Sequence, residues 1–234
     1  MTPLIRSVLA RVSLSALLLT GCRAAPGRPT LADLPLRPND LTDFTTLYRE
    51  NCAGCHGADG RFGAATDLNN PVYLGIIDDT SMRRAIALGV PGTSMPPFAE
   101  SAGGDLTDHQ VDLIVAGIRK NWAGAPDAAA GAPSYFSSAA GNPENGAQVY
   151  ASNCQSCHGA DGKGGPNAGS VVDASYLALV SNQNLRTIVI AGRSDLGHPD
   201  WKHEASGLPL TAQQVSDVVA WLSSKRSAAV ADGK

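Results

Sequence analysis

The chain contains the pentapeptide Cys52-Ala53-Gly54-Cys55-His56 and repeats its pattern 102 residues later as Cys154-Gln155-Ser156-Cys157-His158. Each copy continues as His-Gly-Ala-Asp-Gly. Cys-x-x-Cys-His is the attachment pattern of c-type haem, in which both thiols are joined to one macrocycle and the histidine is placed under the iron. One copy alone also fits a zinc or thiol redox site. Two copies with the same continuation predict two covalently bound haem c groups.

The cysteine count supports this interpretation. Four of the five cysteines lie in the two motifs and the fifth is Cys22, so no pair remains for a structural disulfide. A structural zinc site uses four protein ligands, whereas each pentapeptide offers three. The predicted haem attachment residues are therefore the motif cysteines, and the predicted proximal iron ligands are the motif histidines: Cys52, Cys55, Cys154 and Cys157, with His56 and His158.

The N-terminal segment predicts export and a lipid anchor. Arg6 and Arg11 are followed by the apolar run 12–19 and then by Leu-Thr-Gly-Cys, which ends at Cys22. This leader is too short to span a bilayer and is typical of a secretory signal. Small residues just before a cysteine resemble a bacterial lipoprotein processing site, so we expect Cys22 to carry lipid. An ordinary secretory signal with an incidental cysteine is the alternative.

The charge balance argues against a nucleic-acid partner. The 234-residue chain has a formal net charge of −3, and removal of residues 1–21 takes away two arginines and no acids, which gives −5. No basic tract longer than Lys225-Arg226 occurs. A mildly acidic surface is compatible with a basic redox partner.

The chain also repeats itself outside the motifs. Residues 47–52 match residues 149–154 at an offset of 102, and residues 106–111 match residues 210–215 at an offset of 104. A drift of two residues over a whole unit indicates a duplicated domain. We predict a signal peptide at 1–21, a proline-rich tether at 22–39, domains at 40–122 and 142–226 joined by a linker at 123–141, and a tail at 227–234.

The apolar spacing predicts an all-α fold. The first helix of the first domain is expected at about 41–51, with Asn39-Asp40 or Thr42 as caps, and its counterpart after Asn142-Pro143. Middle helices are expected at 80–88 and 182–191, each ended by a glycine. Last helices are expected to begin at Thr107 and Thr211. Their buried stripes are Val111, Ile114, Val115 and Ile118 in one and Val215, Val218, Val219 and Leu222 in the other.

From about residue 40 to residue 226 the pattern resembles two tandem class I cytochrome c domains. The haem pentapeptides and the segments after the middle helices carry that resemblance. It implies an all-α fold for each domain, one covalently bound haem in a crevice with an exposed edge, and electron transfer as the activity.

The resemblance also implies a second axial ligand from the loop after the middle helix. In the first domain, residues 92–98 fit the methionine segment of the family, which makes Met95 the expected ligand. A thioether ligand raises the reduction potential of haem iron. Met82 lies in the middle helix, opposite Leu185 of the second copy, and is expected in the core.

The second domain departs from the family because no methionine follows Met95. Counting six residues from Gly192 reaches His198, as six residues from Gly89 reach Met95, and proline follows in both. His198 is therefore the predicted second ligand. The alternatives are His203 and an iron that is open or bound by water. His109 is expected to face solvent.

These features favour a membrane-tethered dihaem electron carrier on the outer side of a bacterial membrane, facing the periplasm or the cell exterior. Its expected redox partners are a quinol-oxidising complex, a terminal oxidase or a photosynthetic reaction centre. The rival class is an enzyme, either a dihaem peroxidase with an open coordination position or a sulfur-compound dehydrogenase, some of which need a spare cysteine. A third hypothesis is a subunit of a larger respiratory complex, with the same haem chemistry.

Overall fold

The computed structural model describes residues 35–203 and 206–226, and every regular element in these ranges is a helix. The chain divides into two units, the first ending at Asp40 and the second beginning at Leu41. The first unit is described only from residue 35, where the short 3-10 helix η3 (Pro38–Asp40) is accompanied by an ion pair from Arg37 to Asp40. The leader, its cysteine and the tail at 227–234 lie outside the described residues.

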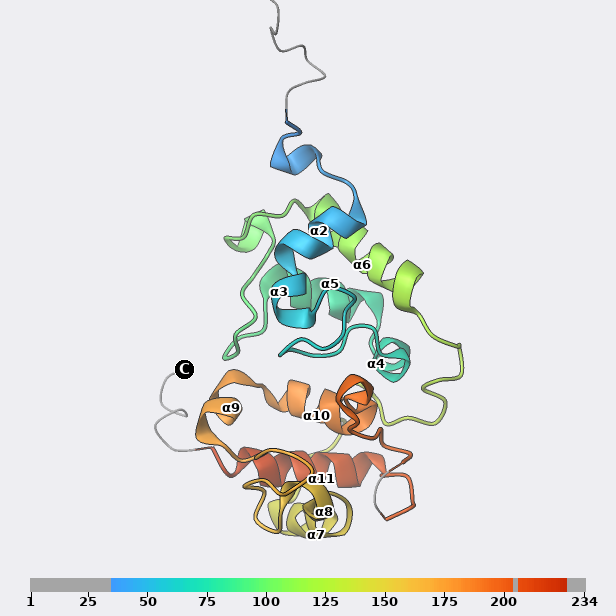
Figure 1. Ribbon diagram of the computed structural model, residues 1–234, viewed down its shortest axis with the longest axis vertical. Coiled ribbons are helices and arrows are strands. Elements are labelled where there is room, and N and C mark those ends of the chain that lie inside the picture. Colours follow the sequence, from blue (N-terminus) through green and yellow to red (C-terminus); the bar gives the residue numbers. More distant parts are fainter. Residues whose placement is uncertain (1–34, 204–205, 227–234) are drawn as a thin grey trace, which may run out of the picture. The chain divides into compact units, whose positions relative to one another are not determined.

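The second unit contains two helical groups that follow one another along the chain (Figure 1). The elements of the first group are α2 (Phe44–Asn51), α3 (Ala53–His56), α4 (Pro71–Ile76), α5 (Asp79–Leu88), η4 (Glu100–Ala102) and α6 (Asp108–Trp122). Those of the second are α7 (Pro143–Asn153), α8 (Gln155–His158), α9 (Ala174–Leu179), α10 (Asn182–Ala191), η5 (Ser194–Leu196) and α11 (Ala212–Ser223). The α-helices of the second group repeat those of the first in the same order, which confirms the predicted duplication, whereas the 3-10 helices differ, since η4 follows Met95 and η5 precedes His198.

Most of the predicted helices are present, and their ends have the expected chemistry. Asn142 caps α7, with Pro143 at the first helical position. Thr107 and Thr211 begin α6 and α11, each with a reciprocal capping box to a glutamine three residues later. None of the helices among the described residues is long and apolar enough to cross a membrane.

Two expectations about the helices were wrong. The first helix begins at Phe44 rather than near residue 41, because the carboxylate of Asp43 accepts the Thr46 backbone N–H at 2.8 Å and so acts as its cap. The short helices α4 and α9 were not predicted. Asn70 and Asp173 cap them, but six residues are too few to show a helical period.

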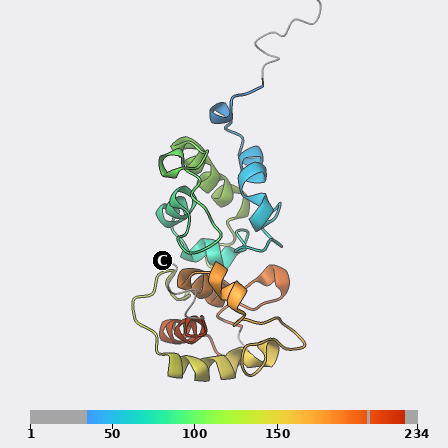
Figure 2. The ribbon, with the colours of Figure 1, turned by 90° about the vertical axis from the view of Figure 1, so that its left-hand side faces the viewer.

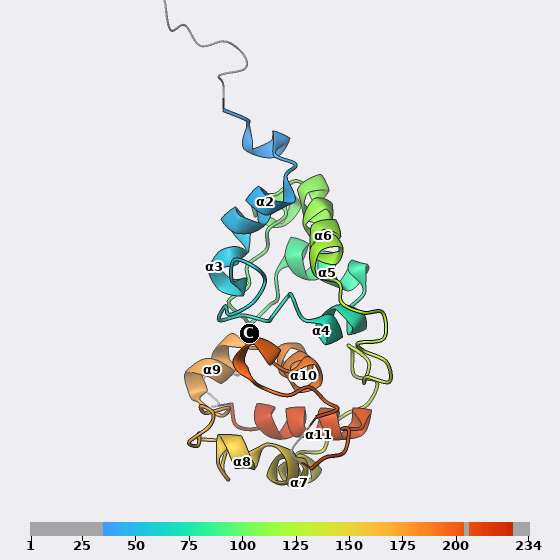
Figure 3. The same ribbon diagram turned by 45° about the vertical axis from the view of Figure 1, so that its right-hand side comes forward.

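The core of each domain lies between its first and last helices. α6 packs against α2, and α11 packs against α7 (Figures 2 and 3). All eight stripe residues are buried, as are Met82 and Leu185. The segment 123–141 contains no helix, yet it is held in place because the buried guanidinium of Arg186 donates to the carbonyls of Ser134 and Tyr135.

The two helix crossings exchange a large and a small residue. In the first domain Gly117 of α6 lies directly against the ring of Phe44 of α2. At the equivalent positions the second domain has Trp221 on α11 and Gly146 on α7, and Gly146 lies against Trp221 and the Asp217 carbonyl. The large side chain at the crossing therefore comes from the first helix in the first domain and from the last helix in the second.

We expect Gly117→Ala and Gly146→Ala each to lower the free energy of unfolding by about 1–3 kcal/mol, because the added methyl group overlaps a ring or a backbone carbonyl. Urea unfolding measures this loss. Gly54→Ala is the control, since nothing lies within 4 Å of its added methyl group, and it should change stability by less than about 0.5 kcal/mol. Equal midpoints for all three variants would contradict the close crossings.

Candidate haem sites

Each pentapeptide forms a single helical turn that presents its two thiols one turn apart. α3 and α8 follow directly from α2 and α7, and the backbone N–H groups of His56 and His158 donate to the first cysteine of their motif at 3.0 Å. Residues three apart on a helix are neighbours on one face. Cys55 and Cys157 are exposed, whereas Cys52 and Cys154 are half-buried. Burial raises the pKa of Cys52 to about 12, so this thiol is protonated at neutral pH.

The two motif histidines are oriented by the same hydrogen bond. Nδ1 of His56 lies 2.8 Å from the carbonyl oxygen of Thr66, and Nδ1 of His158 lies 2.8 Å from that of Gly169. A carbonyl only accepts, so Nδ1 carries the proton and Nε2 keeps its lone pair for a metal. Burial also lowers the pKa of His56, which favours the neutral imidazole that binds iron.

A tyrosine holds the turn that follows each histidine. The hydroxyl of Tyr48 donates to the carbonyl of Gly57 at 2.9 Å, and the hydroxyl of Tyr150 donates to that of Gly159 at 2.6 Å. Both tyrosines are almost fully buried and come from the preceding helix. Each domain thus fixes the helix, the motif and the turn as one piece.

The two segments after the middle helices have the same backbone geometry. Gly89 and Gly192 end α5 and α10 with φ of 66° and 69°. The residue after each glycine donates its N–H to the carbonyl five residues further on: Val90 to that of Met95 at 3.0 Å, and Arg193 to that of His198 at 3.2 Å. His198 therefore occupies the place of Met95, as the spacing predicted.

The imidazole rings of His158 and His198 lie close together in the second domain. Their ring centroids are 6.0 Å apart, with an interplanar angle of 47°. This separation is compatible with one metal ion bound between the two rings, since a metal–nitrogen bond is about 2 Å long and the distance from nitrogen to ring centre is added on each side. Burial lowers the pKa of His198, and so does the neighbouring His158, so His198 is neutral at pH 7.

The other candidate residues lie as follows. Met95 is half-buried and packs against the core of its domain. His203 points to solvent, with 73% of its side chain exposed, and its Nδ1 lies 2.7 Å from a carboxylate oxygen of Asp200. His109 is exposed near the start of α6. The structure thus brings His198, and not His203, to the motif histidine of the second domain.

The donor set of the second domain fits a haem held between two imidazoles. Two thiols on one turn, one oriented Nε2 and a second imidazole opposite it are the groups that such a site needs. The buried indole N–H of Trp201 has no hydrogen-bond partner among the described residues, which leaves a donor for a further acceptor. In the first domain the thiols and the oriented Nε2 are present in the same arrangement.

Comparison with known sequences agrees with this geometry. Residues 143–225 match the model of the cytochrome c family, and residues 39–116 match that of cbb3-type cytochrome c oxidase subunit III. The chain therefore consists of two cytochrome c domains in tandem, each with one covalently bound haem c.

Its curated relatives are subunits of cbb3-type oxidases. The FixP subunit of Sinorhizobium medicae is 32% identical over 161 residues, which are 63% of this chain and 49% of the relative. The FixP subunit of Azorhizobium caulinodans is 30% identical over 79% of this chain and 62% of the relative. The CcoP subunit of Azospirillum is 30% identical over 57% of this chain and 46% of the relative. The chain spans about half the length of most of these relatives.

Sequence reasoning missed the groups that orient the histidines. Thr66 and Gly169 act through backbone carbonyls, which no residue type encodes. The tyrosine pair was detectable, because Tyr48 and Tyr150 occupy equivalent positions, each four residues before the first cysteine of its motif. The spacing alone did not show that their hydroxyls reach the turn after the histidine.

We expect Tyr48→Phe and Tyr150→Phe each to lower the free energy of unfolding by about 1–2 kcal/mol, because each leaves a partly buried carbonyl without its donor. Thermal unfolding of the haem-loaded protein measures this loss. The two effects should add in the double variant, since each bond lies within its own domain. An unchanged midpoint in both single variants would show that water replaces the hydroxyl.

Proposed function

We propose that this protein carries single electrons between redox partners and does no bond chemistry of its own. The observation that supports this most is the pairing of His158 with His198, 6.0 Å between ring centroids. Two imidazoles on one iron leave no coordination position for a substrate. A peroxidase would need such a position.

When bound, haem supplies the one-electron change between ferric and ferrous iron, and the chain sets how readily it occurs. We assign Cys52, Cys55 and His56 to the first haem, with Met95 as its second ligand. Cys154, Cys157, His158 and His198 hold the second. Because a thioether favours the reduced state more than a second imidazole does, the first site has the higher potential.

A cbb3-type terminal oxidase is the proposed acceptor or host complex. The curated relatives are named as subunits of such oxidases, and the first domain matches the model of their subunit III. A quinol-oxidising complex is the corresponding donor. Co-purification from detergent-solubilised membranes separates a stable subunit from a carrier that binds its partners transiently.

Membrane attachment is proposed through lipid on Cys22, which places both domains on the outer face of a bacterial membrane. The cysteine count supports this anchor, because Cys22 is the one cysteine outside the haem motifs and lipid would occupy a thiol that is otherwise reactive.

We expect His198→Ala to convert the second haem from a low-spin form into a high-spin form that binds carbon monoxide and cyanide quickly. The native protein should bind both slowly, because His158 and His198 would together leave no coordination position open on the iron. His198→Met should close the site again and raise its potential. Absorption spectra, ligand-binding kinetics and a redox titration measure these changes.

His203→Ala is the matched control, since His203 is exposed and bonded to Asp200. It should leave the second haem low-spin. If His203→Ala opens the site while His198→Ala does not, the ligand assignment is wrong. If the native second haem is already high-spin and binds ligands readily, a peroxidase activity replaces the carrier function.

We expect Cys22→Ser to abolish lipid labelling and to move the protein out of the membrane fraction or leave it unprocessed. The thiol is the group that a lipoprotein acyl chain is attached to, and a hydroxyl does not replace it. Metabolic labelling with a fatty acid and fractionation measure the effect. Labelling that persists in Cys22→Ser would refute the lipid anchor.

A further inference from the structure

The second domain has a charged pair where the first has none. Arg193-Ser194-Asp195 follows Gly192, whereas Val90-Pro91-Gly92 follows Gly89 at the equivalent place. The side chains of Arg193 and Asp195 are only 11% and 0% exposed. Two hydrogen bonds join them, at 2.9 and 2.8 Å. The bond from Arg193 lowers the pKa of Asp195 to about 2, so the pair is charged at neutral pH.

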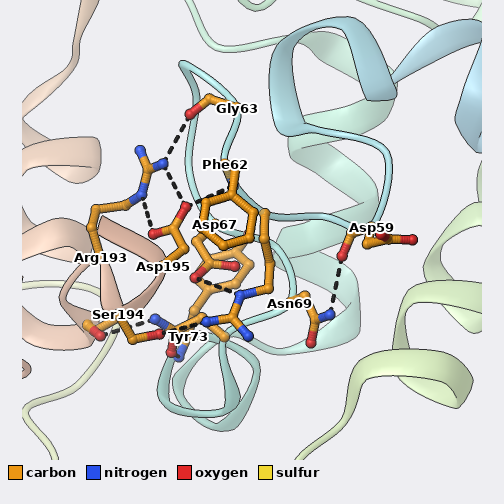
Figure 4. Close-up of polar contacts among 12 residues, drawn as sticks. Asp59, Phe62, Gly63, Asp67, Asn69, Tyr73, Arg193, Ser194 and Asp195 are labelled. Atoms are coloured by element: carbon orange, nitrogen blue, oxygen red, sulfur yellow. Dashed lines mark hydrogen bonds and ion pairs between the residues drawn. The ribbon is translucent and has the colours of Figure 1, made fainter. Parts of the chain in front are cut away.

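This pair reaches into the first domain (Figure 4). The guanidinium of Arg193 donates to the carbonyls of Ala65 at 3.0 Å and Gly63 at 2.9 Å. The carboxylate of Asp195 accepts the backbone N–H of Phe62 at 2.8 Å. Three backbone groups of the loop 62–65 are therefore hydrogen-bonded to two side chains of the second domain.

The loop that is held in this way is strained and belongs to the first haem site. Among the described residues, Phe62 is the one non-glycine residue with positive φ, at 62°. Thr66, the residue directly after the loop 62–65, supplies the carbonyl that orients His56. Its hydroxyl in turn accepts a hydrogen bond from Asn184 of α10 at 2.8 Å. The position of the Thr66 carbonyl thus depends on contacts from the second domain.

The same arginine is also tied to the second haem site. Its backbone N–H and carbonyl pair with the carbonyl and N–H of His198 at 3.2 and 3.0 Å. One residue therefore bonds the segment that carries His198 through its backbone and the loop that orients His56 through its side chain.

We propose that Arg193, with Asp195, is a positioning pair through which the second domain sets the hydrogen bond of His56 and hence the potential of the first haem. This inference rests on the proposed role of His56 as an iron ligand. A hydrogen bond from Nδ1 makes the imidazole a more basic ligand. A more basic ligand stabilises ferric iron, so loss of the bond raises the potential.

Arg193→Lys tests the pair at constant charge. An ammonium has no planar fork and cannot bridge two carbonyls and a carboxylate as the guanidinium does. The double variant R193Q/D195N removes the pair and also keeps the net charge. Each should shift the redox equilibrium of the first haem about threefold to tenfold toward the reduced form, which is about 30–59 mV for one electron. The control is Arg83→Lys, because Arg83 pairs with the exposed Asp108 and Asp112 of its own domain.

Proton NMR of the oxidised, haem-loaded full chain gives a second readout. The Nδ1 proton of His56 should exchange with solvent faster in both test variants. That of His158, which is bonded to Gly169, should not change and so serves as the internal control. A general loss of stability would speed up both protons.

The outcomes separate this inference from the ligand assignment. Hyperfine-shifted Nδ1 protons from both motif histidines in the native protein establish the ligands first, and their absence would refute the proposed sites rather than the pair. If the ligands are established and Arg193→Lys leaves both the potential of the first haem and the His56 exchange rate unchanged, the positioning role is wrong. Should Asn184→Ala, which removes only the bond to the Thr66 hydroxyl, speed up His56 exchange to a smaller extent, the role is supported.

Discussion

Each domain is organised around the hydrogen bond from the motif histidine to a carbonyl in the loop that follows. In both copies the Nδ1–oxygen distance is 2.8 Å, although the acceptors are Thr66 in one and Gly169 in the other. The bond decides which nitrogen is free for a metal, and it requires the preceding helix, the motif turn and the loop to keep fixed relative positions. The hydroxyls of the two buried tyrosines hold the turn directly after the motif histidine.

The two copies show which features this constraint fixes and which it leaves open. The capping boxes, the tyrosine bonds and the glycine that ends the middle helix are the same in both. The large residue at the helix crossing has changed sides, from Phe44 on the first helix to Trp221 on the last. Packing tolerates that exchange because the total volume between the helices is kept. The residue in the segment after the middle helix has also changed, from Met95 to His198 in the same backbone frame.

The two domains are joined by hydrogen bonds at a place where their sequences differ. Arg193 and Asp195 have no counterparts in the first domain, and they bond the loop that orients its histidine. The pair is almost fully shielded from solvent, so its bonds are not weakened by water as those of an exposed ion pair are. Two candidate haem sites built from a duplicated sequence thereby acquire different surroundings.

The sequence by itself determined the two haem motifs, the duplication, the long helices with their buried stripes and the register that sets His198 opposite Met95. These follow from local spacing, which the chain keeps whatever surrounds it. It did not show the cap at Asp43 or the short helices α4 and α9, because six residues carry no period. Only the tertiary structure decided which carbonyls orient the histidines, that His198 rather than His203 faces His158, and that Arg193 reaches the loop 62–65. These depend on contacts between residues far apart in the chain, and the acceptors are backbone atoms that every residue carries.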